Sequence, residues 1–218
     1  MTFVSRLLTA GSLLALITLA PSAHAQLFSL DDGTAELSVG VTGGGTLTWG
    51  NHFVTAGATN ITSIQVAFGS PSFPVPAQNG LAVTIQLFSD PTNDANPSDA
   101  VLLTSTAGVI ASEATNTFIN YPITSTALAS GAHFYAVATV THLNGQFPAA
   151  QDTSSNSADS LAAVGSNFTT ATTIGGLGLP GRWLVRAVGS ASVAPEPGTL
   201  ALLGIGCAMA GLVRRRKL

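Results

Sequence analysis

The sequence predicts an all-β protein, an antiparallel β-sandwich or jelly roll that lies between one apolar segment at each end of the chain. Three observations lead to this prediction. Apolar and polar residues alternate with a period of two in several short runs, which is typical of strands with one buried face. Clusters of Gly, Pro, Asn and Asp separate these runs and are typical of turns. The central part of the chain shows no 3.6-residue period with helix-capping residues.

The strands are predicted in order from this alternation. Residues 81–88 and 134–141 alternate most strictly, and residues 61–68 form a third candidate with a looser pattern. Shorter candidate strands cover residues 35–41, 46–49, 101–104, 117–121 and 183–188. The predicted turns cover residues 43–45, 70–76, 78–80, 90–99 and 144–145. About eight short strands with such turns are typical of a sandwich or jelly roll.

A secretory signal peptide is predicted for residues 1–25. An early arginine precedes an apolar region at residues 7–20, and Ala23 and Ala25 supply the small residues of a cleavage site. Gln26 is therefore the expected first residue of the mature protein. The alternative is an N-terminal membrane anchor, but the apolar region is short for that role.

The predicted body, residues 26–190, is strongly acidic. It holds nine acidic side chains against two basic ones, Arg182 and Arg186, for a formal charge of −7. Such a surface repels phosphate backbones, so nucleic acid is not an expected partner. The one cysteine, Cys207, lies in the C-terminal apolar segment, which means that the body forms no internal disulfide.

The C-terminal segment, residues 191–218, has three parts. It opens with a proline-flanked tripeptide that keeps the chain extended, Pro195, Glu196 and Pro197. An uncharged run at residues 199–213 follows, and as a helix it would rise about 22 Å, less than the hydrocarbon core of about 30 Å. This length favours a temporary membrane stop. A basic cluster ends the chain and is expected to stay in the cytoplasm, with the body outside: Arg214, Arg215, Arg216 and Lys217.

These three parts, together with the N-terminal signal, resemble the PEP-CTERM sorting signal of Gram-negative bacteria. The resemblance covers residues 192–218 and implies that an integral-membrane exosortase recognises the tripeptide and processes the tail, with the arginines as the stop. The partners during export would be the Sec translocon and exosortase. The protein would be anchored transiently in the inner membrane and then reside in the envelope, at the outer surface or outside the cell. Similar tails are also catalogued as an ice-binding-protein C-terminus, a label that describes only the tail.

The resemblance implies a role linked to exopolysaccharide and biofilm, and we expect a structural or adhesive protein with exopolysaccharide or other envelope proteins as partners. No enzyme is expected, because the sequence has no nucleophile elbow, phosphate-binding loop or dinucleotide fingerprint. The alternative is a secreted carbohydrate-binding module or carbohydrate-active enzyme on the same fold. Four aromatic residues would then form a sugar-stacking platform, although burial in the core is the commoner outcome: Trp49, Trp183, Tyr121 and Tyr135.

Calcium is the one candidate cofactor, and the densest polar cluster suggests it. Carboxylate and amide oxygens, the ligands that calcium prefers, come from Asp90, Asn93, Asp94, Asn96 and Asp99. An EF-hand that began at Asp94 would need Gly and Glu at its sixth and twelfth positions, where the sequence has Asp99 and Ser105. The alternative is a hydrophilic turn between two strands.

The body histidines show no metal-binding spacing. His133 and His142 fall at opposite ends of one predicted strand, about 30 Å apart, so they do not share a metal. His52 is free to join either one, and the sequence does not decide between them. A long polar connection at residues 152–160 is either a surface loop or a functional one.

Overall fold

The computed structural model describes residues 25–73, 76–154 and 158–191, which belong to one folded unit, Ala25–Ala191. Most of the predicted signal peptide lies outside these residues, as does the predicted C-terminal segment after Ala191, with its PEP tripeptide and apolar helix. Within the described ranges, no helix has the length and apolar character needed to cross a membrane.

The described residues are almost entirely strands and turns, which confirms the prediction of an all-β body. The strands are β1 (Ala25–Phe28), β2 (Leu37–Val39), β3 (Gly44–Val54), β4 (Thr59–Val66), β5 (Ala82–Asp90), β6 (Val101–Val109), β7 (Ile119–Leu128), β8 (His133–Leu143), β9 (Ala149–Asp152), β10 (Ser160–Val164), β11 (Thr172–Thr173), β12 (Arg182–Trp183) and β13 (Val185–Ala191). Three short 3-10 turns complete them, η1 (Pro97–Asp99), η2 (Phe168–Thr170) and η3 (Ile174–Leu177).

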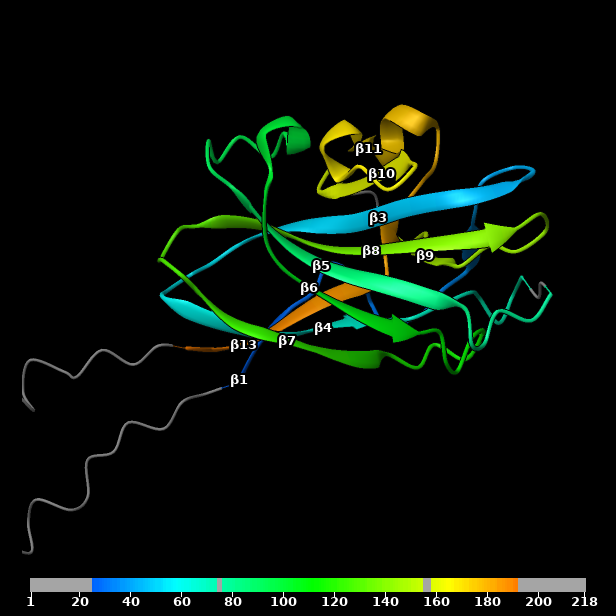
Figure 1. Ribbon diagram of the computed structural model, residues 1–218, viewed down its shortest axis with the longest axis horizontal. Coiled ribbons are helices and arrows are strands. Elements are labelled where there is room, and N and C mark those ends of the chain that lie inside the picture. The colour runs from blue at the N-terminus through cyan, green and yellow to red at the C-terminus, as the bar shows by residue number, and fades with distance from the viewer. Residues whose placement is uncertain (1–24, 74–75, 155–157, 192–218) are drawn as a thin grey trace, which may run out of the picture. The chain divides into compact units, whose positions relative to one another are not determined.

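The strands form three antiparallel sheets (Figure 1). The larger two have the orders β11-β10-β3-β8-β5-β6 and β1-β13-β4-β7, and a small third sheet has the order β12-β9-β2. The strands β1 and β13, first and last in the described chain, are neighbours, and Ala25 lies opposite Ser190. Both ends of the folded unit therefore lie at one edge of the four-stranded sheet.

The main core lies between the two larger sheets. Trp49, Phe53 and Phe134 from the six-stranded sheet pack in one cluster with Ile64 and Val185 from the four-stranded sheet. Burial of such apolar side chains is the main stabilising term of the fold. Trp49 and Trp183 have zero exposure, and Tyr135 and Tyr121 are also buried.

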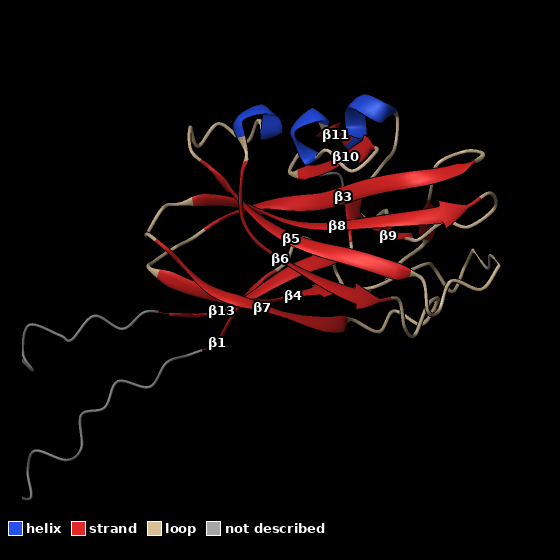
Figure 2. Ribbon diagram, viewed as in Figure 1, coloured by secondary structure: helices blue, strands red, loops and turns tan. Residues whose placement is uncertain are grey.

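A second, smaller core covers the other face of the six-stranded sheet. Phe168 of η2 packs its ring against Phe88 and Tyr135, with ring centroids 5.1 and 5.2 Å apart. The three 3-10 turns lie on this side (Figure 2), where η2 and η3 contact β10 and η1 contacts η2. The central strands are consequently buried on both faces, and this arrangement positions the polar cluster described below.

Candidate functional site

The 90–99 connection folds as a series of turns closed by its own side chains. Asp90 Oδ1 accepts a hydrogen bond from the backbone N–H of Asn93 at 2.9 Å, and Asp94 Oδ1 accepts one from Asn96 at 2.8 Å. Asn96 Oδ1 then caps η1 by accepting from the N–H of Ser98. Such bonds to nearby backbone groups are typical of Asp and Asn in turns.

The structure brings together three of the five predicted calcium ligands. Asp90, Asp94 and Asp99 each place one carboxylate oxygen within 4.8 Å of the others. The amide oxygens of the other two are engaged with backbone N–H groups, Asn93 with His133 and Asn96 with Ser98. Calcium binding at this connection stays a prediction.

Two histidines meet beside this connection. His52 Nε2 lies 3.0 Å from His133 Nδ1, and these two nitrogens lie 3.9 and 4.0 Å from Asp90 Oδ2. Strand register explains the meeting, because Asp90 of β5 lies opposite His133 of β8, and His52 of β3 lies opposite Tyr135 of β8. Opposite residues, and residues two apart on one strand, share a face of the sheet.

Further polar groups hold this cluster in place. Asp159 Oδ1 lies 3.0 Å from His52 Nδ1, and the backbone N–H of His52 donates to the carbonyl of Asp159. The hydroxyl of Tyr135 donates to Asp90 Oδ2 at 3.2 Å, and the N–H of Ala95 donates to the same oxygen at 2.9 Å. We call His52, His133, Asp90, Asp159 and Tyr135 the histidine cluster.

Asp90, His52 and Tyr135 of the histidine cluster are buried, whereas His133 is partly exposed and the side chain of Asp159 is 45% exposed. The side chain of Asp90 has zero exposure, that of His52 is 6% exposed and that of His133 is 24% exposed. Burial opposes ionisation of Asp90, but hydrogen bonds from Ala95, Tyr135 and Asn93 outweigh it and hold the pKa of this carboxyl below its usual value. Burial, followed by the nearby Asp90 charge, raises the pKa of Tyr135, so its hydroxyl remains a donor at neutral pH.

The structure answers the question that the sequence left open for His52. His52 joins His133, whereas His142 lies near the other end of β8, where its Nε2 accepts a hydrogen bond from the N–H of Val41. Sequence reasoning missed Asp159 and Tyr135 as parts of the cluster. Tyr135 had a signal, since it lies two residues after His133 on one predicted strand, but the place of Asp159 depends on pairing between β10 and β3.

Another carboxylate group, formed by Asp32, Glu36 and Asp152, supports local turns. Asp152 accepts hydrogen bonds from the N–H groups of Asp32 and Ser154, and Glu36 accepts one from that of Thr153. These bonds account for the approach of the three acids, two of which lie on the β1–β2 connection while Asp152 ends β9. The group is consistent with a structural role.

The four aromatic residues considered as a sugar platform lie in the cores. Trp49, Trp183 and Tyr135 have zero exposure and Tyr121 has 6%. The indole N–H of Trp183 donates to the carbonyl of Leu161 at 2.8 Å. A sugar-stacking platform must present its ring faces to the ligand, and these buried rings cannot do so. The four residues therefore belong to the cores.

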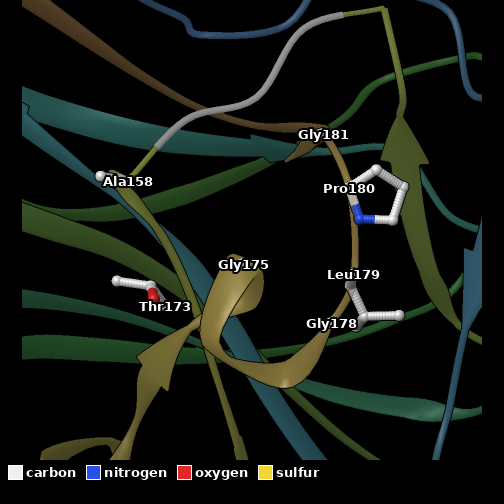
Figure 3. Close-up of a pocket in the computed structure, with 7 residues that line it drawn as sticks. All are labelled: Ala158, Thr173, Gly175, Gly178, Leu179, Pro180 and Gly181. Carbon is white, nitrogen blue, oxygen red and sulfur yellow. The ribbon is translucent and has the colours of Figure 1, made fainter.

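A pocket of about 530 Å³ lies beside η3 (Figure 3). Its lining comprises Ala158, Thr173 and five residues of the 175–181 segment, among them Leu179 and Pro180. None of the described lining residues is charged. The lining offers the Thr173 hydroxyl, backbone polar groups and apolar surface, and its Ala158 precedes Asp159 of the histidine cluster in the chain.

A comparison with family models identifies the tail. The model described as "PEP-CTERM protein-sorting motif" matches residues 193–217. This chain carries a PEP-CTERM motif. The match confirms the resemblance that the sequence indicated, and the PEP-CTERM motif makes the chain an exported substrate of exosortase that is sorted to the cell envelope. The matched residues lie in the tail, so the match gives no information about the function of the body, residues 26–190.

The other comparisons add little to this assignment. No curated protein matches the chain. Among solved structures, a chain from the structure of infectious bursal disease virus, Gx strain, is similar at 16% identity, with a TM-score of 0.30. The alignment covers 81% of this chain and 38% of that chain, and a TM-score this low carries no argument about fold or function.

Proposed function

We propose that this protein is a structural or adhesive component of the cell envelope or extracellular matrix, and that its work is linked to exopolysaccharide and biofilm. The observation that carries the proposal is the PEP-CTERM motif at residues 193–217, which directs the chain out of the cytosol. The protein acts by displaying a rigid β surface and polar turns to glycans or to other copies of itself. It needs no catalytic step for this role.

The arrangement of the body supports such display. Ala25 and Ser190 are neighbours, so both ends of the folded unit leave from one sheet edge. The turn between β8 and β9 lies at the opposite end of the strands from Ala191 (Figure 1). A body that is held through residue 191 therefore has its far turns available to contact other molecules.

The alternative, a secreted carbohydrate-binding module or enzyme, has less support. The four aromatic residues suggested for sugar stacking are buried in the cores. A glycan array tests the binding alternative on the exported protein. An assay for polysaccharide hydrolysis tests the enzyme alternative. Activity that disappears when one carboxylate of the body is replaced would establish an enzyme and contradict the structural role.

The sorting step is tested by replacing Pro195, Glu196 and Pro197 with alanine in a host that carries exosortase. We expect the variant to remain unprocessed in the inner membrane, whereas the unmodified chain is cleaved and leaves it. Cell fractionation and intact mass of the product measure the outcome. Ser192→Ala, just outside the matched residues, is the control and should be processed normally. Normal processing of the tripeptide variant would contradict the assignment.

The matrix role is tested in the native cell by deleting the gene. We expect less exopolysaccharide retained at the cell surface and a thinner biofilm, with recovery when the unmodified gene is restored. Complementation with the tripeptide variant should fail, because the protein does not reach its destination. A biofilm of unchanged mass and polysaccharide content would count against the matrix role and leave the sorting assignment standing.

A further inference from the structure

We propose that His52, His133 and Asp90 bind a divalent transition-metal ion, and that zinc is the ion their geometry fits best. The proposal goes beyond sorting and matrix function, and neither depends on it. Two imidazole nitrogens and one carboxylate oxygen form a mixed donor set that suits zinc and its first-row neighbours. Calcium and magnesium favour sites built from oxygen alone.

The three donor atoms have the spacing that such an ion needs. They form a triangle with sides of 3.0, 3.9 and 4.0 Å, from His52 Nε2 to His133 Nδ1 and from each of these to Asp90 Oδ2. The point equidistant from the three corners lies about 2.1 Å from each atom, within the range of Zn–N and Zn–O bonds of about 2.0–2.2 Å. At this point the ion lies in the plane of the donors, so a tetrahedral site requires Asp90 Oδ2 to move closer to the two nitrogens when zinc binds.

The groups around the donors match the usual support of a metal site. A metal-bound histidine commonly donates its other ring N–H to a carboxylate, which sets the tautomer and directs the free nitrogen to the metal. Asp159 Oδ1 lies 3.0 Å from His52 Nδ1, in position to play this part. Asp90 Oδ2, the donor oxygen, also accepts hydrogen bonds from the hydroxyl of Tyr135 and the N–H of Ala95, which fix the position of the carboxylate and must lengthen when the ion binds.

Charge and access also favour a cation here. The carboxylate of Asp90 is fully buried, and among the described residues its ion pairs are with His52 and His133. Buried charges in proteins are usually paired or bound to metals. His133, at 24% side-chain exposure, borders the open side, where an ion can enter and where water can take a fourth position.

The first experiment measures zinc binding to the exported, processed protein, purified without a histidine tag from the envelope fraction and stripped with a chelator. We expect about one zinc per chain, and a rise of about 5–10 °C in Tm at a hundredfold excess over Kd. His133→Ala should remove both effects. Binding with no fixed stoichiometry, or zinc binding that survives His133→Ala, would overturn the proposal.

Two control variants locate the site. His142→Asn changes the third histidine of the body, which lies toward the other end of β8, and should leave zinc binding within about twofold. Asp94→Asn removes one acid of the 90–99 connection but none of the three donors, and should do the same. If Asp94→Asn abolishes zinc binding while His133→Ala keeps it, the acidic connection holds the ion and the proposal is wrong.

A second measurement uses the unmodified protein, so it does not depend on a variant that folds. The geometry predicts that zinc binds His52 through Nε2 and His133 through Nδ1. NMR of the protein labelled with ¹⁵N in its histidines should show these two nitrogens shifting on addition of zinc, while His52 Nδ1 keeps its proton. Shifts at the opposite nitrogens, or no shift of either ring, would rule out the site.

Discussion

Asn51 illustrates how one buried side chain joins distant parts of this fold. Its amide donates to the carbonyl oxygens of Trp183 and Val185 at 2.9 and 2.8 Å, and the hydroxyl of Ser160 donates to its Oδ1 at 2.7 Å. The residue has zero exposure, so water cannot replace these bonds. One residue of β3 thus connects β10, β12 and β13.

Replacing Asn51 with alanine should lower the free energy of unfolding by about 2–4 kcal/mol, because two buried carbonyls and one hydroxyl lose their partner. Denaturant-induced unfolding measures the change. Asn120→Ala, at an exposed position of β7, is the matched control and should stay within about 0.5 kcal/mol. Equal losses in the two variants would show that the three bonds add nothing to stability.

Tyr121 makes the free energy of unfolding depend on pH in the alkaline range. Burial raises the pKa of Tyr121 from 10.0 to about 12. The unfolded chain therefore releases this proton at a lower pH than the folded protein does. The contribution to stability is complete below pH 10 and is lost as the pH rises to about 12.

We expect Tyr121→Phe to lose less of its stability between pH 10 and 12 than the unmodified protein, since phenylalanine has no proton to release. Urea unfolding at a series of pH values gives the two slopes. The comparison concerns the slopes, so a uniform loss of stability from the missing hydroxyl does not affect it. Slopes that coincide would refute this account of Tyr121.

The outer strands of the two larger sheets meet along one side. β6 and β7 are edge strands of different sheets, and the hydroxyl of Tyr121 in β7 donates to the carbonyl of Val109 in β6 at 2.8 Å. The ring lies so close to Gly108 that a Cβ there would overlap it. The contact covers part of two strand edges that would otherwise be open to association.

Gly108→Ala should therefore separate β6 from β7 locally and lower the free energy of unfolding by about 1–3 kcal/mol. Thermal unfolding measures the loss. Gly57→Ala is the control, because a Cβ at Gly57 meets nothing within 4 Å. The expectation fails if Gly108→Ala is as stable as Gly57→Ala.

The 90–99 connection keeps its calcium hypothesis. If Asp90, Asp94 and Asp99 bind calcium in the folded state alone, millimolar calcium should raise Tm in proportion to the logarithm of its concentration. Asp94→Asn should reduce the rise, whereas His142→Asn should keep it. An unchanged Tm at millimolar calcium would contradict the calcium hypothesis and would favour the interpretation of residues 90–99 as a hydrophilic turn.

Strand prediction located β5 and β8 over most of their length, but it underestimated the length of β3. Seven consecutive residues of β3, from Leu47 to Phe53, are buried, so alternation identified only residues 46–49. The candidate at 183–188 proved to be the end of β12 and the first part of β13, and β10 begins inside the polar connection at 152–160. Short strands of small residues lack a distinctive pattern.

The described part of the chain belongs to one folded unit, whose first and last strands are paired. Phe28 of β1 lies opposite Ala187 of β13, and both belong to the main core. The main core thus draws on residues from 28 to 187.

A chain of residues 26–191 should consequently unfold at the same Tm as the full chain, within about 2 °C. Differential scanning calorimetry of both chains measures this, and Phe28→Ala provides the contrast, with a loss of about 3 kcal/mol from the core. A markedly lower Tm for the shorter chain would mean that the ends contribute to stability.

The all-β class and the PEP-CTERM tail could be predicted because each depends on residues that are close in the sequence. Alternation, turn residues, an apolar run and a basic cluster are local patterns, and no tertiary contact is needed to recognise them. The histidine cluster is different. His52 and His133 are 81 residues apart, and strand order, register and face together bring them within hydrogen-bond distance. Strand order, register and face depend on how all the strands pack together. The approach of His52 to His133 could therefore be recognised only in the folded structure.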